Sequence, residues 1–220
     1  MARSLRARVL SVCARFFPEN GRVLDLGCGA GLDAAVLEAM GHPVVAVDAS
    51  AGMVAEARTR ARDARRGDLA ALEPLVPDGP FDGALSNFGA LNCLADLDGF
   101  ARGLAALLRP GAHAVLVVIN RWCPAEDLTL LARFRRPRRH VRTVDVEGMP
   151  VALRYLGGRE VERALPAFEP VHREALGALV APPDLGGRPG RRTRLEPWIA
   201  GWPVIRDLGD HSLVVLRRRP

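Results

Sequence analysis

The strongest constraint on the fold is residues 23–31 (VLDLGCGAG), where an apolar run ends in an acid and glycines then alternate with small residues. The apolar run suits a strand that is buried on both faces of a parallel sheet. Glycine at every second position lets the backbone turn sharply, and it lets a ligand lie against the main chain where a Cβ atom would clash. A helical pattern begins at about Leu32, and a helix N-terminus offers free N–H groups and a positive dipole end to an anion. These features predict a nucleotide-type ligand site at the first strand–helix junction of an α/β sheet, with a tight turn that holds no ligand as the alternative.

The chain continues as a regular alternation of strand and helix patterns up to residue 119. We expect helices over 2–17, 32–40, 50–64 and 97–108, and strands over 23–26, 44–47, 64–69, 81–86 and 114–119. The 64–69 segment is poorly apolar and is expected to be a short edge strand. This alternation predicts an α/β fold with a doubly wound, mostly parallel sheet.

The order of elements changes after residue 120. A helix over about 125–135 precedes two alternating runs, 141–147 and 150–156, which predict a β-hairpin joined at Gly148. A short helix (159–165), a long strand (168–180), a loop rich in Pro, Gly and Arg (181–192), another short helix and a last strand (212–217) complete the chain. We interpret residues 1–220 as one domain, with a helix and a hairpin inserted as a cap at about 121–157.

Composition narrows the function classes without choosing one. The chain has 220 residues, 49% of them hydrophobic, which fits one domain with a substantial core. No apolar run approaches the roughly 20 residues that span a bilayer, and the N-terminal segment is too interrupted for a signal-peptide core, so a cytoplasmic protein is expected. The four cysteines lack metal-ligand spacing, so neither a metal site nor a disulfide framework is expected. All 31 basic residues are arginine, so the net charge of +6 permits an acidic partner without requiring one.

The glycine spacing separates two kinds of nucleotide site. The dinucleotide fingerprint needs its third glycine one residue later, where this chain has Leu32. Asp-x-Gly-x-Gly-x-Gly instead resembles the first motif of the class I S-adenosylmethionine-dependent methyltransferases. Four further stretches resemble that family in the expected order: 47–53 (VDASAGM), 67–69 (GDL), 81–88 (FDGALSNF) and 107–111 (LLRPG). The resemblance covers about residues 22–119.

The resemblance implies S-adenosylmethionine as the cofactor and a seven-stranded sheet whose last strand is antiparallel. In such a fold Asp48 accepts both ribose hydroxyls and Met53 lies on the adenine face, although ordinary helix packing is an equal alternative for Met53. Asp68 presents a carboxylate to the adenine amino group, and Leu69 presents a backbone N–H to a ring nitrogen. The N-terminal helix resembles a segment that covers the cofactor. The cofactor-binding residues implied in this way are Asp25, Gly27, Cys28, Gly29, Gly31, Asp48, Ala49, Met53, Asp68, Leu69 and Asn87.

The end of the fourth strand bears on the acceptor. Family members that methylate amides or exocyclic amines carry Asn or Asp, two prolines and an aromatic residue there, whereas residues 87–90 of this chain are NFGA. This difference argues against N-methylation of the adenine or glutamine type. We expect a small-molecule acceptor that is methylated on O or N. His211 and Tyr155 are the candidate catalytic residues, with an ordinary structural histidine as the alternative for His211. The candidate substrate residues at the same sheet edge are Asn92, Arg121 and Trp122.

Other functions stay open at this point. Residues 133–139 contain five arginines, which suits either a solvated face or an enzyme that approaches a membrane to methylate a lipid or a quinone precursor. The run carries one aromatic residue, Phe134, so nucleic-acid binding is not favoured. A non-catalytic binding protein with a methyltransferase-like fold is another possibility. An NAD-dependent oxidoreductase is disfavoured by Leu32.

Overall fold

A seven-stranded sheet is the central layer of the protein, seen in a computed structural model that describes residues 2–132, 142–146, 149–178 and 196–220. The strand order is β3-β2-β1-β4-β5-β9-β8. Strands β1 to β5 are parallel, and β9 is antiparallel to both of its neighbours. The strands are β1 (Val23–Leu26), β2 (Val44–Asp48), β3 (Ala64–Arg66), β4 (Phe81–Ser86), β5 (Leu108–Ile119), β8 (Phe168–Leu176) and β9 (His211–Arg218). This topology confirms the predicted α/β fold with a mostly parallel sheet and an antiparallel last strand.

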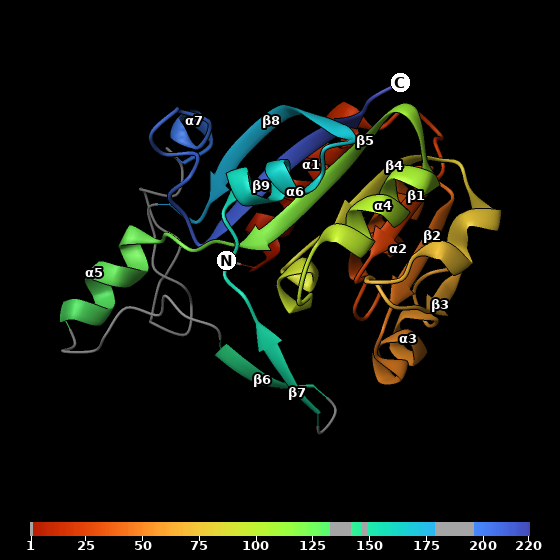
Figure 1. Cartoon of the computed structure of the whole chain (residues 1–220), viewed down its shortest axis with the longest axis horizontal. Helices are drawn as coiled ribbons and strands as arrows, with labels where there is room; N and C mark the ends of the chain where they lie inside the picture. The colour runs from red at the N-terminus through yellow and green to blue at the C-terminus, as the bar shows by residue number, and fades with distance from the viewer. Residues whose placement is uncertain (1, 133–141, 147–148, 179–195) are drawn as a thin grey trace.

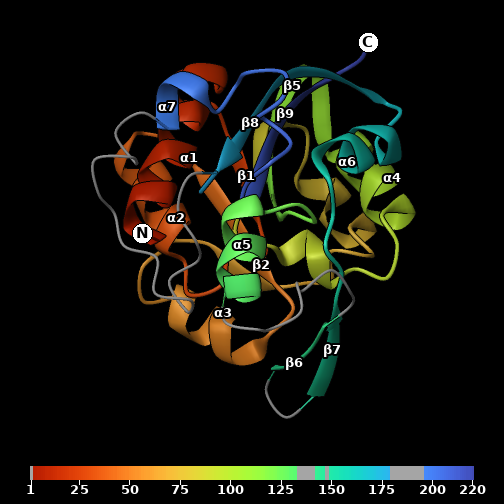
Figure 2. The ribbon, with the colours of Figure 1, turned by 90° about the vertical axis from the view of Figure 1, so that its left-hand side faces the viewer.

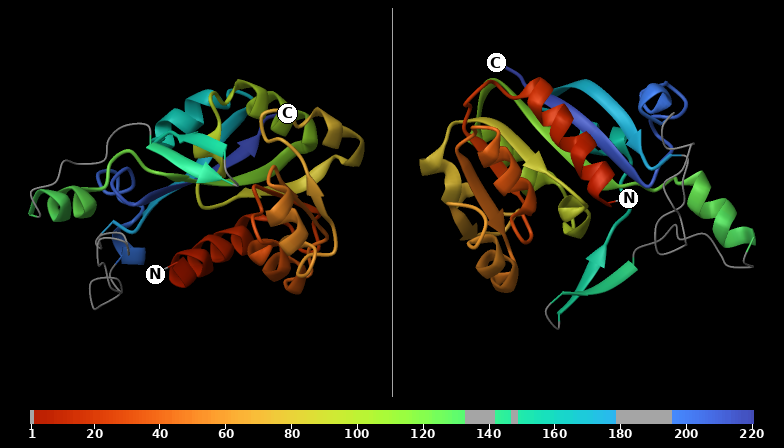
Figure 3. Two further views of the ribbon diagram at one scale, coloured as in Figure 1. Left: turned by 90° about the horizontal axis from the view of Figure 1, so that it is seen from below. Right: turned by 180° about the vertical axis from the view of Figure 1, so that it is seen from behind.

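Helices cover both faces of the sheet (Figures 1 and 3). One face packs against α1 (Ala2–Phe16), α2 (Leu32–Ala39) and α3 (Ala51–Ala57), and the other against the 3₁₀ helix η1 (Glu73–Asp78), α4 (Asp98–Leu107) and α6 (Gly158–Ala164). Successive strand residues supply the two cores in turn: Leu24 and Leu26 join the α4 side, and Val23 joins the α1 side. This division follows from the period of two along a strand.

The insertion after β5 contains the predicted helix and hairpin. Helix α5 (Pro124–Ala132) and the two-stranded sheet of β6 (Arg142–Val146) and β7 (Met149–Leu153) lie outside the main sheet, and Figure 2 shows α5 in front of it. The short helix α7 (Glu196–Ile199) precedes β9. The predicted ends of the first insertion helix (133–135) and of strand 168–180, and the loop 181–192, lie outside the described residues.

Two element boundaries and one additional element differ from the sequence-based expectation. Strand β5 begins at Leu108, which pairs with Phe81 ahead of a register irregularity. Residues 109–111, which lie between the expected helix and the expected strand, are therefore part of the strand. Helix α3 ends at Ala57, because the N–H groups of Thr59 and Arg60 bond three residues back and tighten its last turn. A 3₁₀ helix, η2 (Ala90–Cys93), follows β4 where no element was expected.

Candidate cofactor and acceptor site

The glycines after β1 have different surroundings, although all three adopt positive φ angles. A Cβ atom added to Gly27 would lie 2.2 Å from the Cβ atom of Ala90, and one added to Gly31 would lie 3.0 Å from Cα of Ala57. The same atom on Gly29 would meet nothing within 4 Å. Gly27 and Gly31 therefore allow close packing of the chain, whereas Gly29 borders open space in which a ligand can approach the backbone.

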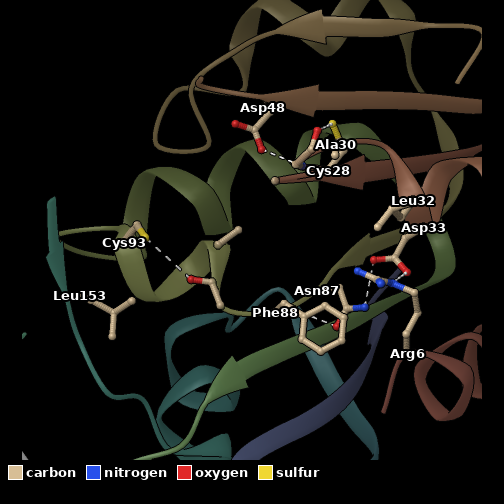
Figure 4. Close-up of a pocket in the computed structure, with 14 residues that line it drawn as sticks. Arg6, Cys28, Ala30, Leu32, Asp33, Asp48, Asn87, Phe88, Cys93 and Leu153 are labelled. Carbon is tan, nitrogen blue, oxygen red and sulfur yellow. Dashed lines mark hydrogen bonds and ion pairs between the residues drawn. The ribbon is translucent and has the colours of Figure 1, made fainter. Parts of the chain in front are cut away.

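That open space belongs to a cavity of about 310 Å³ at the carboxyl ends of β1, β2 and β4, which Figure 4 shows. In a doubly wound sheet this edge, where the strand order reverses, is the usual ligand site. Polar groups lie on the α1 and α2 side, and an apolar and sulfur-bearing wall lies opposite. The lining consists of Arg6, Gly27, Cys28, Gly29, Ala30, Leu32, Asp33, Asp48, Asn87, Phe88, Gly89, Ala90, Cys93 and Leu153.

The carboxylate of Asp48 joins the glycine loop to the next loop. It accepts the N–H of Gly29 at 2.8 Å through Oδ2 and the N–H of Ser50 at 2.9 Å through Oδ1. Ser50 in turn caps α3 by accepting the N–H of Met53 with its side chain. Each carboxylate oxygen has a second lone pair, so Asp48 can still accept hydrogen bonds from a ligand hydroxyl.

A second polar network spans the α1 side of the cavity. Asp33, in the first turn of α2, accepts Nε of Arg6 at 2.8 Å and the side-chain amide of Asn87 at 3.1 Å. The guanidinium of Arg6 also lies 4.9 Å from the ring centroid of Phe88. Helix α1 thereby places a cation at the cavity.

Two ionisable groups beneath the glycine loop have raised pKa values. Burial raises the pKa of Asp25 well above its ordinary value, and the nearby carboxylates of Asp33 and Asp48 raise it further. Burial and the same kind of negative neighbours raise the pKa of the Cys28 thiol to about 12. Cys28 is therefore a packing residue of the loop and not a thiolate nucleophile.

His211 lies at the same edge of the sheet, because β9 runs antiparallel and pairs His211 with Ile119 at the end of β5. Its ring packs edge-on against Phe88, with a centroid separation of 5.8 Å, and its side chain is 13% exposed. The Nδ1 atom lies 3.2 Å from Oδ2 of Asp210, without hydrogen-bonding geometry. A carboxylate and an imidazole are thus adjacent beside the cavity.

The structure brings five of the predicted cofactor residues to the cavity wall: Gly27, Cys28, Gly29, Asp48 and Asn87. The other six lie outside the lining, and their roles stay predictions. Asp25 is buried under the loop, Gly31 packs on α3, and Leu69 is buried in the core. The carbonyl of Ala49 accepts Nε of Arg66, Met53 is 45% exposed, and the carboxylate of Asp68 accepts the N–H of Ala70.

The predicted acceptor residues divide among three places. Arg121 and Trp122 line a separate cavity of about 360 Å³, between the end of β5 and α6. Tyr155 lies between β7 and α6, where its carbonyl accepts the guanidinium of Arg121. Asn92 is fully buried in η2. These three groups therefore do not share the cofactor-side cavity, and their substrate or catalytic roles stay predictions.

Sequence reasoning missed several residues that line the cavity, above all Arg6, Asp33, Phe88, Cys93 and Leu153. Asp33 resembles an ordinary acid in the first turn of a helix, but its position two residues after the last loop glycine was a usable signal. Arg6 and Leu153 are brought in from elements distant in the sequence, so no local pattern marks them.

The described residues contain neither a cluster of metal ligands nor a membrane-spanning helix. No group of three or more His, Cys, Asp or Glu side chains there could hold a metal ion. No helix in that part of the chain is both long and apolar enough to cross a bilayer.

Part of this chain is similar in sequence to curated methyltransferases. A curated ubiquinone biosynthesis O-methyltransferase of Sinorhizobium medicae is 34% identical over 117 residues, which cover 52% of this chain and 47% of that protein. A demethylmenaquinone methyltransferase of Beutenbergia cavernae is 37% identical over 111 residues, or 49% of this chain and 45% of that protein. The chain thus spans about half the length of these curated relatives.

The fold and the family are supported separately. The crystal structure of an S-adenosylmethionine-dependent methyltransferase from Mesorhizobium loti matches with a TM-score of 0.59 and 22% identity, covering 98% of this chain and 96% of that one. A family model described as a methyltransferase domain matches residues 1–157. The chain therefore belongs to the methyltransferase-domain family and has the fold of the S-adenosylmethionine-dependent enzymes.

Proposed function

We propose that this protein transfers a methyl group from S-adenosylmethionine to an oxygen or nitrogen atom of a small-molecule acceptor in the cytoplasm. The observation that carries the proposal is the open space at Gly29, inside a cavity that also contains the Asp48 carboxylate. A tight turn without a ligand would not need this space. The proposal treats residues 1–220 as one catalytic domain whose insertion, about 121–157, caps the acceptor side.

The lining residues fit the cofactor in chemistry and position. The backbone at Gly27 and Gly29 would lie against the ligand, and Asp48 would accept the ribose hydroxyls with its unused lone pairs. Arg6, held by Asp33, would face the carboxylate of the amino-acid end. The adenine would extend toward Ala49, Met53, Asp68 and Leu69, as the resemblance implies.

The chemistry requires little beyond alignment. When bound, S-adenosylmethionine supplies a methyl group that is already electrophilic at its sulfonium. The protein's part is to hold the acceptor in line with the methyl–sulfur bond and to exclude water. Phe88 and Leu153 provide an apolar wall for this purpose. His211 would accept the proton that an acceptor hydroxyl or amine must lose.

The test begins with calorimetric titration of S-adenosylhomocysteine. Asp48→Ala should weaken binding by about 1.5–3 kcal/mol, the range for a hydrogen bond to a charged group. Asp48→Asn is the matched control for shape, because it keeps the side-chain volume but loses the charge. Its affinity for S-adenosylhomocysteine should lie between those of the wild type and Asp48→Ala. Unchanged affinity in Asp48→Ala would remove this residue from the cofactor site.

Activity is tested with tritiated S-adenosylmethionine and a panel of phenols, catechols and amines. Label transfer to one chemical class identifies the acceptor. Cofactor binding without transfer to any member of the panel would favour a non-catalytic binding protein with this fold.

A second candidate function is methylation of a lipid or quinone precursor at a membrane surface. Two of the relatives carry quinone-biosynthesis names, and all three tryptophans of the chain are exposed: Trp122 by 46%, Trp198 by 81% and Trp202 by 59%. Exposed tryptophans next to arginine-rich segments suit a lipid interface. Nucleic acid is not favoured as a partner, because the arginine run carries one aromatic residue, Phe134.

A further inference from the structure

Asn92 is the most completely bonded polar side chain near the cavity. It is fully buried in η2, between residues that line the cavity, Ala90 and Cys93. Its side-chain amide donates to the carbonyl of Ile119 at 2.9 Å and to the carbonyl of Arg154 at 2.5 Å. Its side-chain oxygen accepts the N–H of Ile119 at 2.8 Å. Both amide hydrogens are used, so this side chain has no donor left for a substrate.

These bonds join three segments that are far apart in the sequence. Ile119 is the last residue of β5, and Arg154 begins the strap, which we define as residues 154–157 between β7 and α6. The N–H of Arg154 also donates to the backbone carbonyl of Asn92 at 2.7 Å, and the N–H of Leu156 donates to Ile119 at 3.1 Å. The strap is therefore attached to η2 and to the end of β5 at the same place.

The attachment has a consequence for the cavity. Leu153, immediately before the strap, and Cys93, in the same 3₁₀ turn as Asn92, lie side by side on the apolar wall of the cavity (Figure 4). We propose that Asn92 is a positioning residue that holds the strap against η2, and thereby sets the position of this wall and the fit of the acceptor. The effect on the acceptor rests on the proposed function, but the attachment of the strap can be tested without turnover.

The first test measures the strap directly. In Asn92→Asp, an isosteric change that removes both donors, hydrogen exchange at the amides of Arg154 and Leu156 should become at least tenfold faster. Leu104→Ala is the stability-matched control, since Leu104 is fully buried in α4 and lies away from the cavity lining. Wild-type exchange in Asn92→Asp, or equal acceleration in Leu104→Ala, would overturn the proposal.

The second test measures the cavity wall through a thiol. Cys93 is exposed, whereas Cys13, Cys28 and Cys123 are buried, so a soluble disulfide reagent in the folded protein reports on Cys93. Its reaction should be several-fold faster in Asn92→Asp and also in Leu153→Ala, which opens the same wall without touching the attachment. An unchanged rate in Asn92→Asp, together with an increase in Leu153→Ala, would contradict the positioning role.

The third test separates positioning from general damage. With an acceptor found in the panel above, Asn92→Asp should raise KM at least tenfold while kcat and the Kd for S-adenosylhomocysteine stay within threefold. A fall in kcat alone would contradict the proposal. If no acceptor is turned over, the proposed function fails, and the exchange and thiol results still decide whether Asn92 holds the strap.

Discussion

At the scale of single residues, the loop after β1 separates two uses of glycine that look identical in the sequence. Gly27 lacks a side chain because Ala90 occupies the space, and Gly29 lacks one although the protein places nothing there. The first glycine serves the fold, and the second serves a ligand. Only their surroundings in the structure distinguish them, since both belong to the same alternating motif and both adopt positive φ angles.

We therefore expect opposite outcomes from the same substitution at the two positions. Gly27→Ala should lower stability by more than about 1 kcal/mol, because overpacking adds to backbone strain. Gly29→Ala should lower it by about 1 kcal/mol from the φ strain alone but weaken S-adenosylhomocysteine binding by tenfold or more. Thermal unfolding and calorimetry on both variants check this. Full cofactor affinity in Gly29→Ala would mean that the open space is not the ligand site.

His211 gives a prediction about proton transfer. His211→Ala should lower kcat by roughly 10²–10⁴-fold, the usual contribution of general acid–base catalysis, with little change in cofactor affinity. His113→Ala is the control, because His113 pairs with Arg217 at the opposite end of the same strands. Full activity in His211→Ala would leave positioning alone, with Asn87 and Tyr155 as the next residues to test.

At the scale of elements, an ion pair between the half-exposed Arg8 and the buried carboxylate of Glu174 joins α1 to β8. Arg8 donates two hydrogen bonds to the carboxylate of Glu174, at 2.7 and 2.6 Å, and His172 lies 3.0 Å from the same carboxylate. Burial alone would raise the pKa of Glu174, but the bonds from His172 and Arg8 outweigh it and lower the pKa. Because Arg6 is on the same helix, this pair also helps to hold a cation at the cavity.

The direction of the Glu174 shift sets a pH dependence. A carboxyl with a lowered pKa in the folded state stabilises the protein above the ordinary value of 4.5, and this contribution is lost as the pH falls below it. Glu174→Gln should lower the unfolding free energy at pH 7 by about 1.5–3 kcal/mol, and the difference should shrink toward pH 4. Glu169 lies on β8 like Glu174 and forms an exposed ion pair with Arg217 of β9. Glu169→Gln should therefore lower the unfolding free energy by less than about 1 kcal/mol. Equal losses of unfolding free energy in both variants, measured by denaturant unfolding, would mean that the Arg8–Glu174 pair does not stabilise the protein more than an exposed pair.

The elements also show what a sequence can predict. Buried strands and the glycine loop were predictable because apolar runs, Asp48 and the Ser50 cap are local signals. The early start of β5 was not, because pairing with Phe81 overrides the turn propensity of Arg109-Pro110-Gly111. Tertiary packing brings Arg6, Asp33 and Leu153 to the same cavity, and no spacing in the sequence predicts this arrangement.

At the scale of the whole molecule, charge and exposed apolar groups bear on the choice between the two candidate functions. All 31 basic residues are arginine, so an arginine cluster carries less information here than in a chain that also uses lysine. Five arginines nevertheless follow α5 in the sequence. Leu128 and Leu131 are exposed on this helix, and the exposed Trp122 lies just before it. A soluble acceptor leaves these groups in water, whereas a lipid acceptor would place them against a membrane.

Under the small-acceptor proposal, we expect that replacing Arg135, Arg136, Arg138 and Arg139 with Gln leaves turnover nearly unchanged. Tryptophan emission should likewise not shift when neutral or phosphatidylglycerol vesicles are added; all three tryptophans are exposed, so the emission reports contact with a membrane directly. A blue shift that requires the anionic lipid and fades with salt would favour the lipid candidate instead. In that case each arginine near the surface contributes about 1 kcal/mol, so the fourfold Gln variant should bind such vesicles roughly a thousandfold more weakly. Vesicle binding that survives the fourfold change would assign the contact to the tryptophans, and Trp198→Ser with Trp202→Ser should then abolish it.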